Sequence, residues 1–145
     1  MKKIYNKITN YDIPSDYHII DTSSETITWK IFVSASEFEQ SLLIELLNRI
    51  LTALNIKINE NGEIIKTNPN LIYTIPKAKN QKSCKIICFG ILPEQLQLQG
   101  FNEKYFIYHF QNNTFLFVDN LVNYSNESSK KILWNALKKM KENEA

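Results

Sequence analysis

Apolar and polar residues alternate along residues 26–35, and the spacing then becomes helical over residues 36–54. The first segment is rich in β-branched and aromatic residues, which favour a strand. Ser36 and Glu39 have the spacing of a capping box, which marks the start of a helix. The pattern therefore predicts a strand and then a helix that buries one wide apolar stripe. The stripe consists of Leu43, Leu46, Leu47, Ile50, Leu51 and Leu54.

An uninterrupted apolar run at residues 86–89 is followed at once by Gly90 and then by Pro93. A continuous apolar run bounded by turn residues is typical of a strand that is buried on both faces. Gly90 allows a sharp turn, and Pro93 suits the first turn of a short helix, where its missing N–H is not needed. We expect a strand–turn–helix corner here, which in parallel α/β sheets is a usual place for a ligand.

Polar turns separate several shorter apolar segments. The segments on either side of the turn within residues 56–65 form either a hairpin or a connection from the helix to a strand, and both interpretations stay open. Apolar residues alternate again over residues 71–75. Two aromatic runs flank Asn112 and Asn113, which tolerate positive φ, so residues 103–120 are predicted to form a β-hairpin.

The last apolar stripe predicts a helix over residues 126–141, capped by Asn126 or Ser125 and with lysines near its C-terminus. Its predicted buried side consists of Leu133, Trp134, Leu137 and Met140. The elements together predict the α/β class: a three-layer α/β/α domain with a small central sheet, on which the 36–54 and 126–141 helices pack.

Residues 1–21 have apolar positions that follow neither a helical nor a strand period, and Pro14 interrupts them. Two interpretations stay open: an arm that packs loosely on the domain, or a binding segment that becomes ordered on a partner. Apolar and aromatic anchors suit the second role. The candidate binding residues are Ile4, Tyr5, Ile8, Tyr11, Ile13 and Tyr17. Residues 22–145 are predicted to form one α/β domain.

Composition narrows the functional classes. The chain has 145 residues, of which 43% are hydrophobic and 22% are charged, as in an ordinary globular domain. Its net charge is +2, and Arg49 is the one arginine, although arginine is the usual choice for phosphate and guanine contacts. We therefore predict no sequence-specific nucleic-acid binding. Neither a signal peptide nor an apolar run of the roughly 18 residues that span a membrane is present, so a cytoplasmic protein is expected.

Candidate metal ligands are few. Cys84 and Cys88 stand four apart on the predicted strand, so they share a face at a separation of about 13 Å, too far for a disulfide. We expect both to be small buried apolar side chains. The two histidines, His18 and His109, do not have a metal-binding spacing. No metal site and no cofactor is predicted, and a structural role is expected for His109 in its aromatic strand.

Catalytic motifs are missing from the sequence. The chain has three glycines and contains no Gly-x-Gly-x-x-Gly, P-loop or Gly-x-Ser-x-Gly motif. Glu94 and Asp119 lie near strand ends, but their spacing does not pair them. The lysines within residues 77–85 are expected to form a solvated loop. No catalytic residue is predicted, although a site assembled from distant residues stays open.

An ordered series of short segments runs through the second half of the chain. It consists of Thr74-Ile75-Pro76, then Cys88-Phe89-Gly90, Leu96-Gln97-Leu98, Asn120-Leu121-Val122 and Lys131-Ile132-Leu133-Trp134-Asn135-Ala136-Leu137. This order, over residues 54–140, resembles the psi subunit family of bacterial DNA polymerase III. The Leu-Trp pair on the last helix, about a dozen residues after the Leu121 segment, is the most telling part.

The resemblance implies a non-catalytic adaptor. Psi-like proteins have a compact α/β domain that is similar in outline to uracil-DNA glycosylases, without their catalytic residues. They join the clamp loader, through its tau/gamma subunits, to the chi subunit, which contacts single-stranded DNA-binding protein. Their N-terminal arm binds the clamp loader, and this role falls here on residues 1–21 and their six candidate anchors. The chain departs from the family there, because Tyr5, Tyr11 and Tyr17 are the arm's aromatic residues and it has no tryptophan or arginine. The chi-binding residues stay unassigned.

The alternative to the adaptor is a small nucleotide- or base-processing enzyme with its site at the corner between Gly90 and Pro93. A deep cleft there, with His109 or a carboxylate of perturbed pKa, would favour the enzyme. A shallow apolar patch would favour the adaptor.

Overall fold

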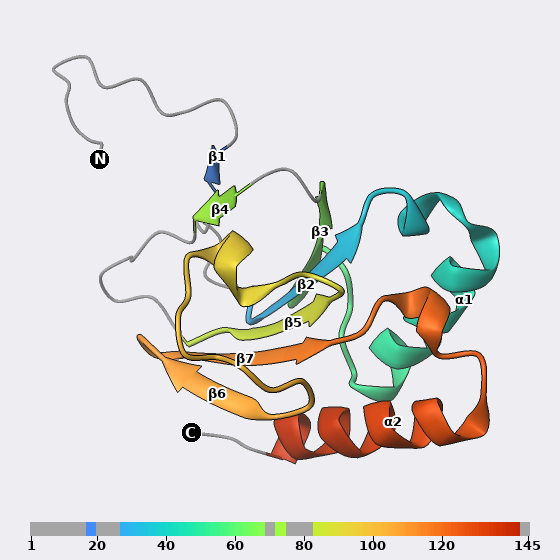
Figure 1. Ribbon diagram of the computed structural model, residues 1–145. Helices are drawn as coiled ribbons and strands as arrows, with labels where there is room; N and C mark the ends of the chain where they lie inside the picture. The colour runs from blue at the N-terminus through green and yellow to red at the C-terminus, as the bar shows by residue number, and fades with distance from the viewer. Residues whose placement is uncertain (1–16, 20–26, 69–71, 75–82, 143–145) are drawn as a thin grey trace, which may run out of the picture.

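A five-stranded mixed sheet forms the centre of the computed structural model, which describes residues 17–19, 27–68, 72–74 and 83–142 (Figure 1). Four strands are parallel, and the edge strand β6 is antiparallel to β7. In spatial order the strands are β3 (Gly62–Thr67), β2 (Trp29–Ser34), β5 (Lys85–Phe89), β7 (Asn113–Val118) and β6 (Ile107–Phe110).

Both α-helices pack on the same face of this sheet. They are α1 (Ser41–Ala53) and α2 (Glu127–Glu142), and Figure 1 shows them on one side of the strands. Alternate strand residues that lie in register, Ile31, Ile87 and Leu116, join the buried stripes of both helices in one core. The predicted core stripe of the first helix is confirmed, with Leu43 and Leu46 half-buried at its margin.

The opposite face is covered by the 3-10 turn η2 (Pro93–Leu96) and the chain after it. Phe32, Cys88 and Phe117 pack there against Leu96 and Leu98. The α/β class is therefore confirmed, but within the described residues the second helical layer of the α/β/α prediction is replaced by a short turn and irregular chain. The reason is local, because η2 ends in a left-handed residue soon after it begins, which stops a longer helix.

The capping-box prediction is wrong. Glu37–Glu39 form a separate 3-10 turn, η1, and the extended backbone of Gln40 (φ −99°, ψ 117°) precedes the first residue of α1. Ser36 makes no capping hydrogen bond, and its hydroxyl instead contacts that of Ser34 at 2.8 Å. The side chain of Glu37, at the start of this turn, is buried.

The turn region within residues 56–65 is a helix-to-strand connection and not a hairpin, because it leads from α1 into β3, which pairs with β2. Gly62 begins β3 in a crowded position, where an added Cβ would lie 2.3 Å from Cγ2 of Ile56. The predicted hairpin is confirmed for β6 and β7, with its turn one residue earlier than expected. Gln111 and Asn112 hold the positive φ values (51° and 71°), and Asn113 already pairs with Phe110.

The predicted corner after β5 is confirmed. Residues 86–89 are fully buried, Gly90 has a φ of +75°, and Pro93 is the first residue of η2. The last helix is also confirmed, because the Ser129 N–H donates to Oδ1 of Asn126 at 2.8 Å and so caps its start. Leu133, Leu137 and Met140 are buried as predicted. Trp134 is only half-buried, since it lies at the margin of the core.

The two thiols behave as expected from the sequence. Cys84 and Cys88 are both buried thiols that form no disulfide with each other, and they lie in the core opposite the helices. Burial raises the pKa of the Cys84 thiol and, more strongly, the pKa of the Cys88 thiol. Both are therefore small apolar side chains that pack the sheet.

A second, two-stranded parallel sheet joins β1 (Tyr17–Ile19) to β4 (Ile72–Thr74), next to η2. β1 falls within the predicted arm of residues 1–21, so part of this segment pairs with the domain. The candidate anchor Tyr17 begins β1. The other anchors, Ile4, Tyr5, Ile8, Tyr11 and Ile13, lie outside the described residues. In the part of the chain that is described, no helix is long and apolar enough to cross a bilayer.

Candidate functional site at the carboxyl edge of the sheet

The connections after β2 and β5 leave the sheet on opposite faces. β2 leads into η1 and α1 on the helix-covered face, whereas β5 leads through Gly90 into η2 on the other face. Because β2 and β5 are neighbouring parallel strands, their carboxyl ends frame a crevice of the kind in which open α/β sheets bind ligands. This edge is therefore the candidate functional site.

Glu37 bridges this edge with its own carboxylate. Its side chain is buried, and its two oxygens accept the backbone N–H groups of Leu121 (3.2 Å) and Val122 (3.0 Å). Both donors belong to η3 (Leu121–Asn123), the 3-10 turn after β7. Backbone N–H groups at the start of such a turn suit an anion. The anion here is supplied by the segment that follows β2, so the chain fills this position itself.

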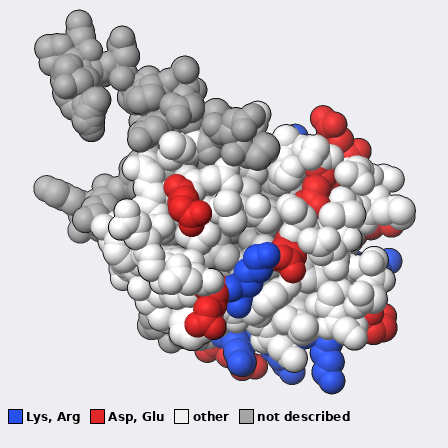
Figure 2. All heavy atoms as spheres, in the orientation of Figure 1, with Lys and Arg blue, Asp and Glu red and all other residues white. Residues whose placement is uncertain are grey.

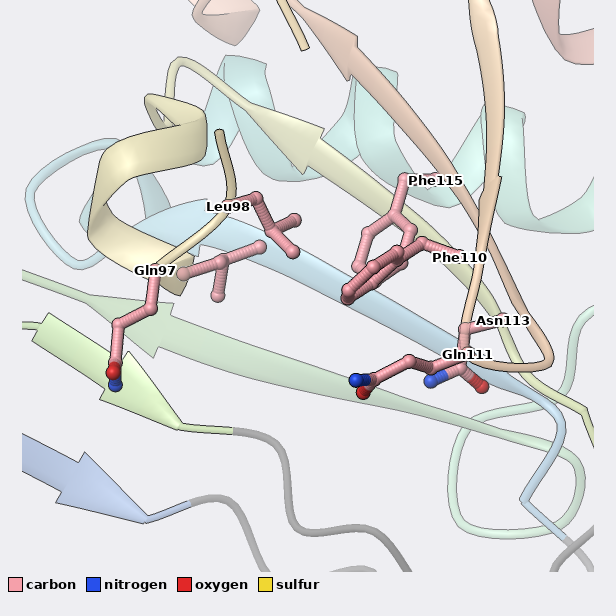
Figure 3. A pocket seen from close by; sticks show the side chains of 7 residues that line it. Gln97, Leu98, Phe110, Gln111, Asn113 and Phe115 are labelled. Carbon is pink, nitrogen blue, oxygen red and sulfur yellow. The ribbon is translucent and has the colours of Figure 1, made fainter. Parts of the chain in front are cut away.

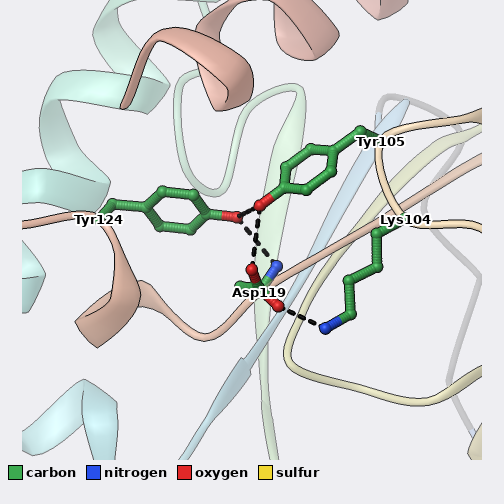
Figure 4. Close-up of polar contacts among 4 residues, drawn as sticks. All are labelled: Lys104, Tyr105, Asp119 and Tyr124. Atoms are coloured by element: carbon green, nitrogen blue, oxygen red, sulfur yellow. Dashed lines mark hydrogen bonds and ion pairs between the residues drawn. The ribbon is translucent and has the colours of Figure 1, made fainter. Parts of the chain in front are cut away.

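Asp119 directly follows β7 and belongs to a second polar cluster (Figure 4). Its carboxylate forms an ion pair with Lys104 and accepts the hydroxyl of Tyr105 at 3.1 Å. The Tyr105 oxygen lies 2.7 Å from that of Tyr124, which accepts the Asp119 backbone N–H at 2.9 Å. Since Tyr105 uses its proton on Asp119, Tyr124 must donate to Tyr105. The cluster is thus a closed ring of hydrogen bonds.

The electrostatics of this ring favour a structural carboxylate. The hydrogen bond from Lys104 holds the pKa of Asp119 below its usual value, with a further contribution from Tyr105 and against the effect of burial. Burial is the main cause that raises the pKa of both Tyr105 and Tyr124. A general base that works near neutral pH needs a carboxyl pKa that is raised, not lowered. Asp119 is therefore held ionised and paired.

Tyr105 is also held in an unusual backbone conformation. Its φ of +64° lies in the left-handed region, which costs a non-glycine residue about 1–3 kcal/mol. The Tyr105 N–H donates to the Phe117 carbonyl at 3.0 Å, and its hydroxyl enters the ring around Asp119. These two anchors fix the segment before β6 against the end of β7.

A hollow of about 280 Å³ lies beside the ring, at the corner that the sequence singled out. Gly90 and Pro93 line it together with the charged side chains of Glu94, Lys104 and Asp119. An added Cβ on Gly90 would lie 1.8 Å from Oδ1 of Asn120, which also lines the hollow, so the glycine makes room for that amide. On the face drawn in Figure 2, acidic and basic side chains near the centre lie side by side within a broad uncharged surface.

The structure brings some of the predicted residues together and separates others. Glu94 and Asp119, which the sequence could not pair, line the same hollow. His109 lies on β6 instead, where its Nδ1 is 3.3 Å from the Thr114 hydroxyl, so it does not contribute to the corner. The loop at residues 77–82 lies outside the described residues.

A further hollow, of about 230 Å³, lies near the turn of the β6–β7 hairpin (Figure 3). Leu98, Phe110 and Phe115 form its apolar part, and the amides of Gln97 and Gln111 form its polar part. Among the described residues that line it, none has an ionisable side chain.

Sequence reasoning missed Glu37, Tyr105 and Tyr124. Their partners lie 84, 14 and 19 residues away, and no local spacing marks such pairs. Among the described residues, no group of three or more His, Cys, Asp or Glu side chains is placed to hold a metal ion. Comparisons of the chain with protein-family models, curated proteins and solved structures find no match, so its function must be argued from geometry and from the resemblance.

Proposed function

We propose that this chain is a non-catalytic, psi-like accessory subunit of the DNA polymerase III holoenzyme. In this role it links the tau/gamma subunits of the clamp loader to the chi subunit, and through chi to single-stranded DNA-binding protein, in the cytoplasm. The sequence resemblance over residues 54–140 supports the assignment to this family. On the same ground, the domain is proposed to be similar in outline to uracil-DNA glycosylases.

One structural observation carries the non-catalytic part of this proposal. The crevice where α/β enzymes commonly bind a ligand is bridged by the Glu37 carboxylate, which takes the N–H groups of Leu121 and Val122. The neighbouring carboxylate, Asp119, is likewise engaged by Lys104 and Tyr105. Carboxylates whose oxygens are occupied by internal hydrogen bonds and ion pairs stabilise the fold, and this supports a scaffold role over proton transfer.

Reconstitution tests the proposal directly. The purified chain is mixed with the chi subunit and the tau/gamma clamp-loader subunits of the same host, and complexes are measured by size exclusion with light scattering. We expect one complex with chi alone and a larger one when the clamp loader is added. Failure to form a complex with either protein at micromolar concentration would overturn the psi-like role.

The enzyme alternative keeps one specific observation in its favour. The 280 Å³ hollow at Gly90 has charged side chains of both signs, and it lies at the carboxyl end of parallel strands. Turnover of nucleotides or nucleobases by the full chain, lost in Asp119→Asn, would establish the enzyme. The lowered pKa of Asp119 predicts the opposite result, no turnover in either protein.

A further inference from the structure

Two neighbouring hollows lie along the junction of α1 and α2. One, of about 420 Å³, is lined by Leu42, Leu46 and Val122, and the other, of about 590 Å³, by Leu54 and Trp134. Arg49 and Lys130 line the first hollow, whereas Ala53 and Trp134, each four residues further along the same helix, line the second. Residues four apart are neighbours on a helix surface. The two hollows therefore follow each other at about one helical turn, and we call them the α1–α2 groove.

The groove leaves large apolar side chains in contact with water. Leu42 is 76% exposed and Val122 is 56% exposed, and the Trp134 side chain is half-buried. Two apolar hollows one turn apart match the spacing of side chains at i and i+4 on a helix. The groove thus has the shape and surface chemistry of a site for the apolar stripe of an amphipathic helix.

The charge around the groove indicates which kind of partner helix it would bind. α2 carries five lysines and two glutamates, a net +3, which exceeds the +2 of the whole chain and leaves −1 for all other residues. Figure 2 shows basic side chains along the lower margin, over α2, with acidic ones next to them. The groove itself is lined by Arg49, Lys130, Lys138 and Lys141 against Glu45 and Glu142. A partner with carboxylates beside its apolar stripe complements this rim.

We propose that the α1–α2 groove binds an acidic amphipathic helix of a partner protein. This deepens the proposed adaptor function, on which it rests, by naming one of the surfaces that an adaptor needs. Residues 1–16 of the chain itself contain three lysines and two aspartates, so their charge does not match the rim. A second copy placed across a twofold axis would set one basic rim against another, which is unfavourable.

The test is a selection of displayed random 16-residue peptides on the full chain at 0.15 M salt, where exposed charges beyond about 8 Å are screened. We expect the recovered peptides to be rich in Asp and Glu, with apolar residues at helical spacing. Their synthetic forms should bind Lys138→Glu at least tenfold more weakly than the wild type. Lys139→Glu is the matched control, because Lys139 is an exposed neighbour on α2 that does not line the groove, and it should change binding less than twofold.

A second pair of variants tests the apolar part. Leu42→Ser should weaken the same peptides, whereas Leu92→Ser, an exposed leucine on the other face, should not. Neutral or basic peptides, no recovered peptide, or equal binding to Lys138→Glu and the wild type would overturn the inference. The selection uses neither chi nor the clamp loader, so its failure is separate from failure of the reconstitution.

Discussion

On one face of the sheet, α1 and α2 cover a layer of mainly aliphatic side chains. On the other face, a short turn and irregular chain cover a layer that combines aromatic rings, thiols and an ion pair. The helix-covered core consists mainly of aliphatic side chains, with Trp29, Phe89 and Tyr124 buried among them. The opposite core includes two thiols, a group of aromatic rings and, beside it, the ion pair of buried Lys30 with Glu63. The first face is held by repeated contacts of one kind, and the second by individual contacts between particular groups.

The aromatic group shows how the second face works. Phe101 stacks on Tyr108 with ring centroids 4.5 Å apart, and it meets Phe115 and Phe117 edge-on at 5.9 and 6.3 Å. Phe101 belongs to the irregular segment that follows η2. Its ring contacts therefore attach this segment to the sheet, as the apolar stripes of the helices do on the other face. A substitution on the helix-covered face should therefore cost mainly packing energy, and one on this face mainly a specific pair interaction.

The largest effect is expected on the helix-covered face. Leu137→Ala removes a fully buried side chain from α2 and leaves a cavity, so the free energy of unfolding should fall by about 2–5 kcal/mol. Denaturant unfolding measures this. Ile132→Ala on the same helix is the control, because Ile132 is half exposed and its loss should change stability by less than about 0.5 kcal/mol. Equal effects of the two variants would show that the buried side of α2 is wrongly placed.

Glu37→Gln should have the next largest effect. The amide keeps one oxygen acceptor but turns an NH₂ group toward a backbone N–H that the carboxylate now satisfies, at Leu121 or Val122. A buried donor left without its partner costs about 1–3 kcal/mol. Glu39→Gln, on the exposed side of the same turn, is the matched control. If both variants unfold at the same denaturant concentration, Glu37 does not hold the edge of the sheet together.

These first two predictions also mark what the sequence can reveal. The stripe of α1, the buried strand before Gly90 and the Asn126 cap follow from local spacing, because each repeats or terminates a regular pattern. The capping box predicted from Ser36 does not form, and the neighbouring Glu37 instead makes a contact 84 residues away that no local pattern reports. The second helical layer of the prediction is not found among the described residues, and the part of the chain that covers that face has no regular period that a sequence pattern can report.

On the second face, Phe101→Leu keeps an apolar side chain but removes the stacked ring. Aromatic pairs of this geometry contribute about 0.5–1.5 kcal/mol beyond their buried area. A double-mutant cycle with Tyr108→Leu should therefore give a coupling energy in that range. Coupling near zero would mean that the rings merely fill space, and the contrast between the two faces would disappear.

A smaller, pH-dependent effect is expected at the ring that joins β7 to the segment before β6. The pKa of Asp119 is lower in the folded chain, mainly because of Lys104, so the pair stabilises the fold above the unfolded pKa of about 3.9. That stability is lost as the pH falls through the folded pKa. The Asp119 side chain is 31% exposed and that of Lys104 is 56% exposed. Lys104→Gln should therefore lower the free energy of unfolding by only about 0.2–1 kcal/mol at pH 7.

The measurement is denaturant unfolding of wild type and Lys104→Gln between pH 7 and pH 2, with Lys131→Gln as an exposed control. The difference between wild type and Lys104→Gln should shrink in the acid range, as Asp119 becomes protonated in the folded chain. A difference that persists unchanged to pH 2 would assign the effect of Lys104 to packing and not to its charge.

The smallest effect on stability is expected from deletion of residues 1–16, which lie outside the described residues. The truncation keeps β1, whose residues 17–19 pair with β4. The free energy of unfolding should therefore stay within about 0.5 kcal/mol of that of the full chain. The deletion removes Ile4, Tyr5, Ile8, Tyr11 and Ile13 and leaves Tyr17. If these side chains supply the affinity of a segment that orders on binding, clamp-loader binding should be lost while chi binding persists.

A second deletion, of residues 1–21, also removes β1, and only this one should lower stability by exposing the partner edge of β4. Clamp-loader binding that survives the shorter deletion would contradict the role assigned to the arm. Unfolding by the shorter deletion would place residues 1–16 in the folded core.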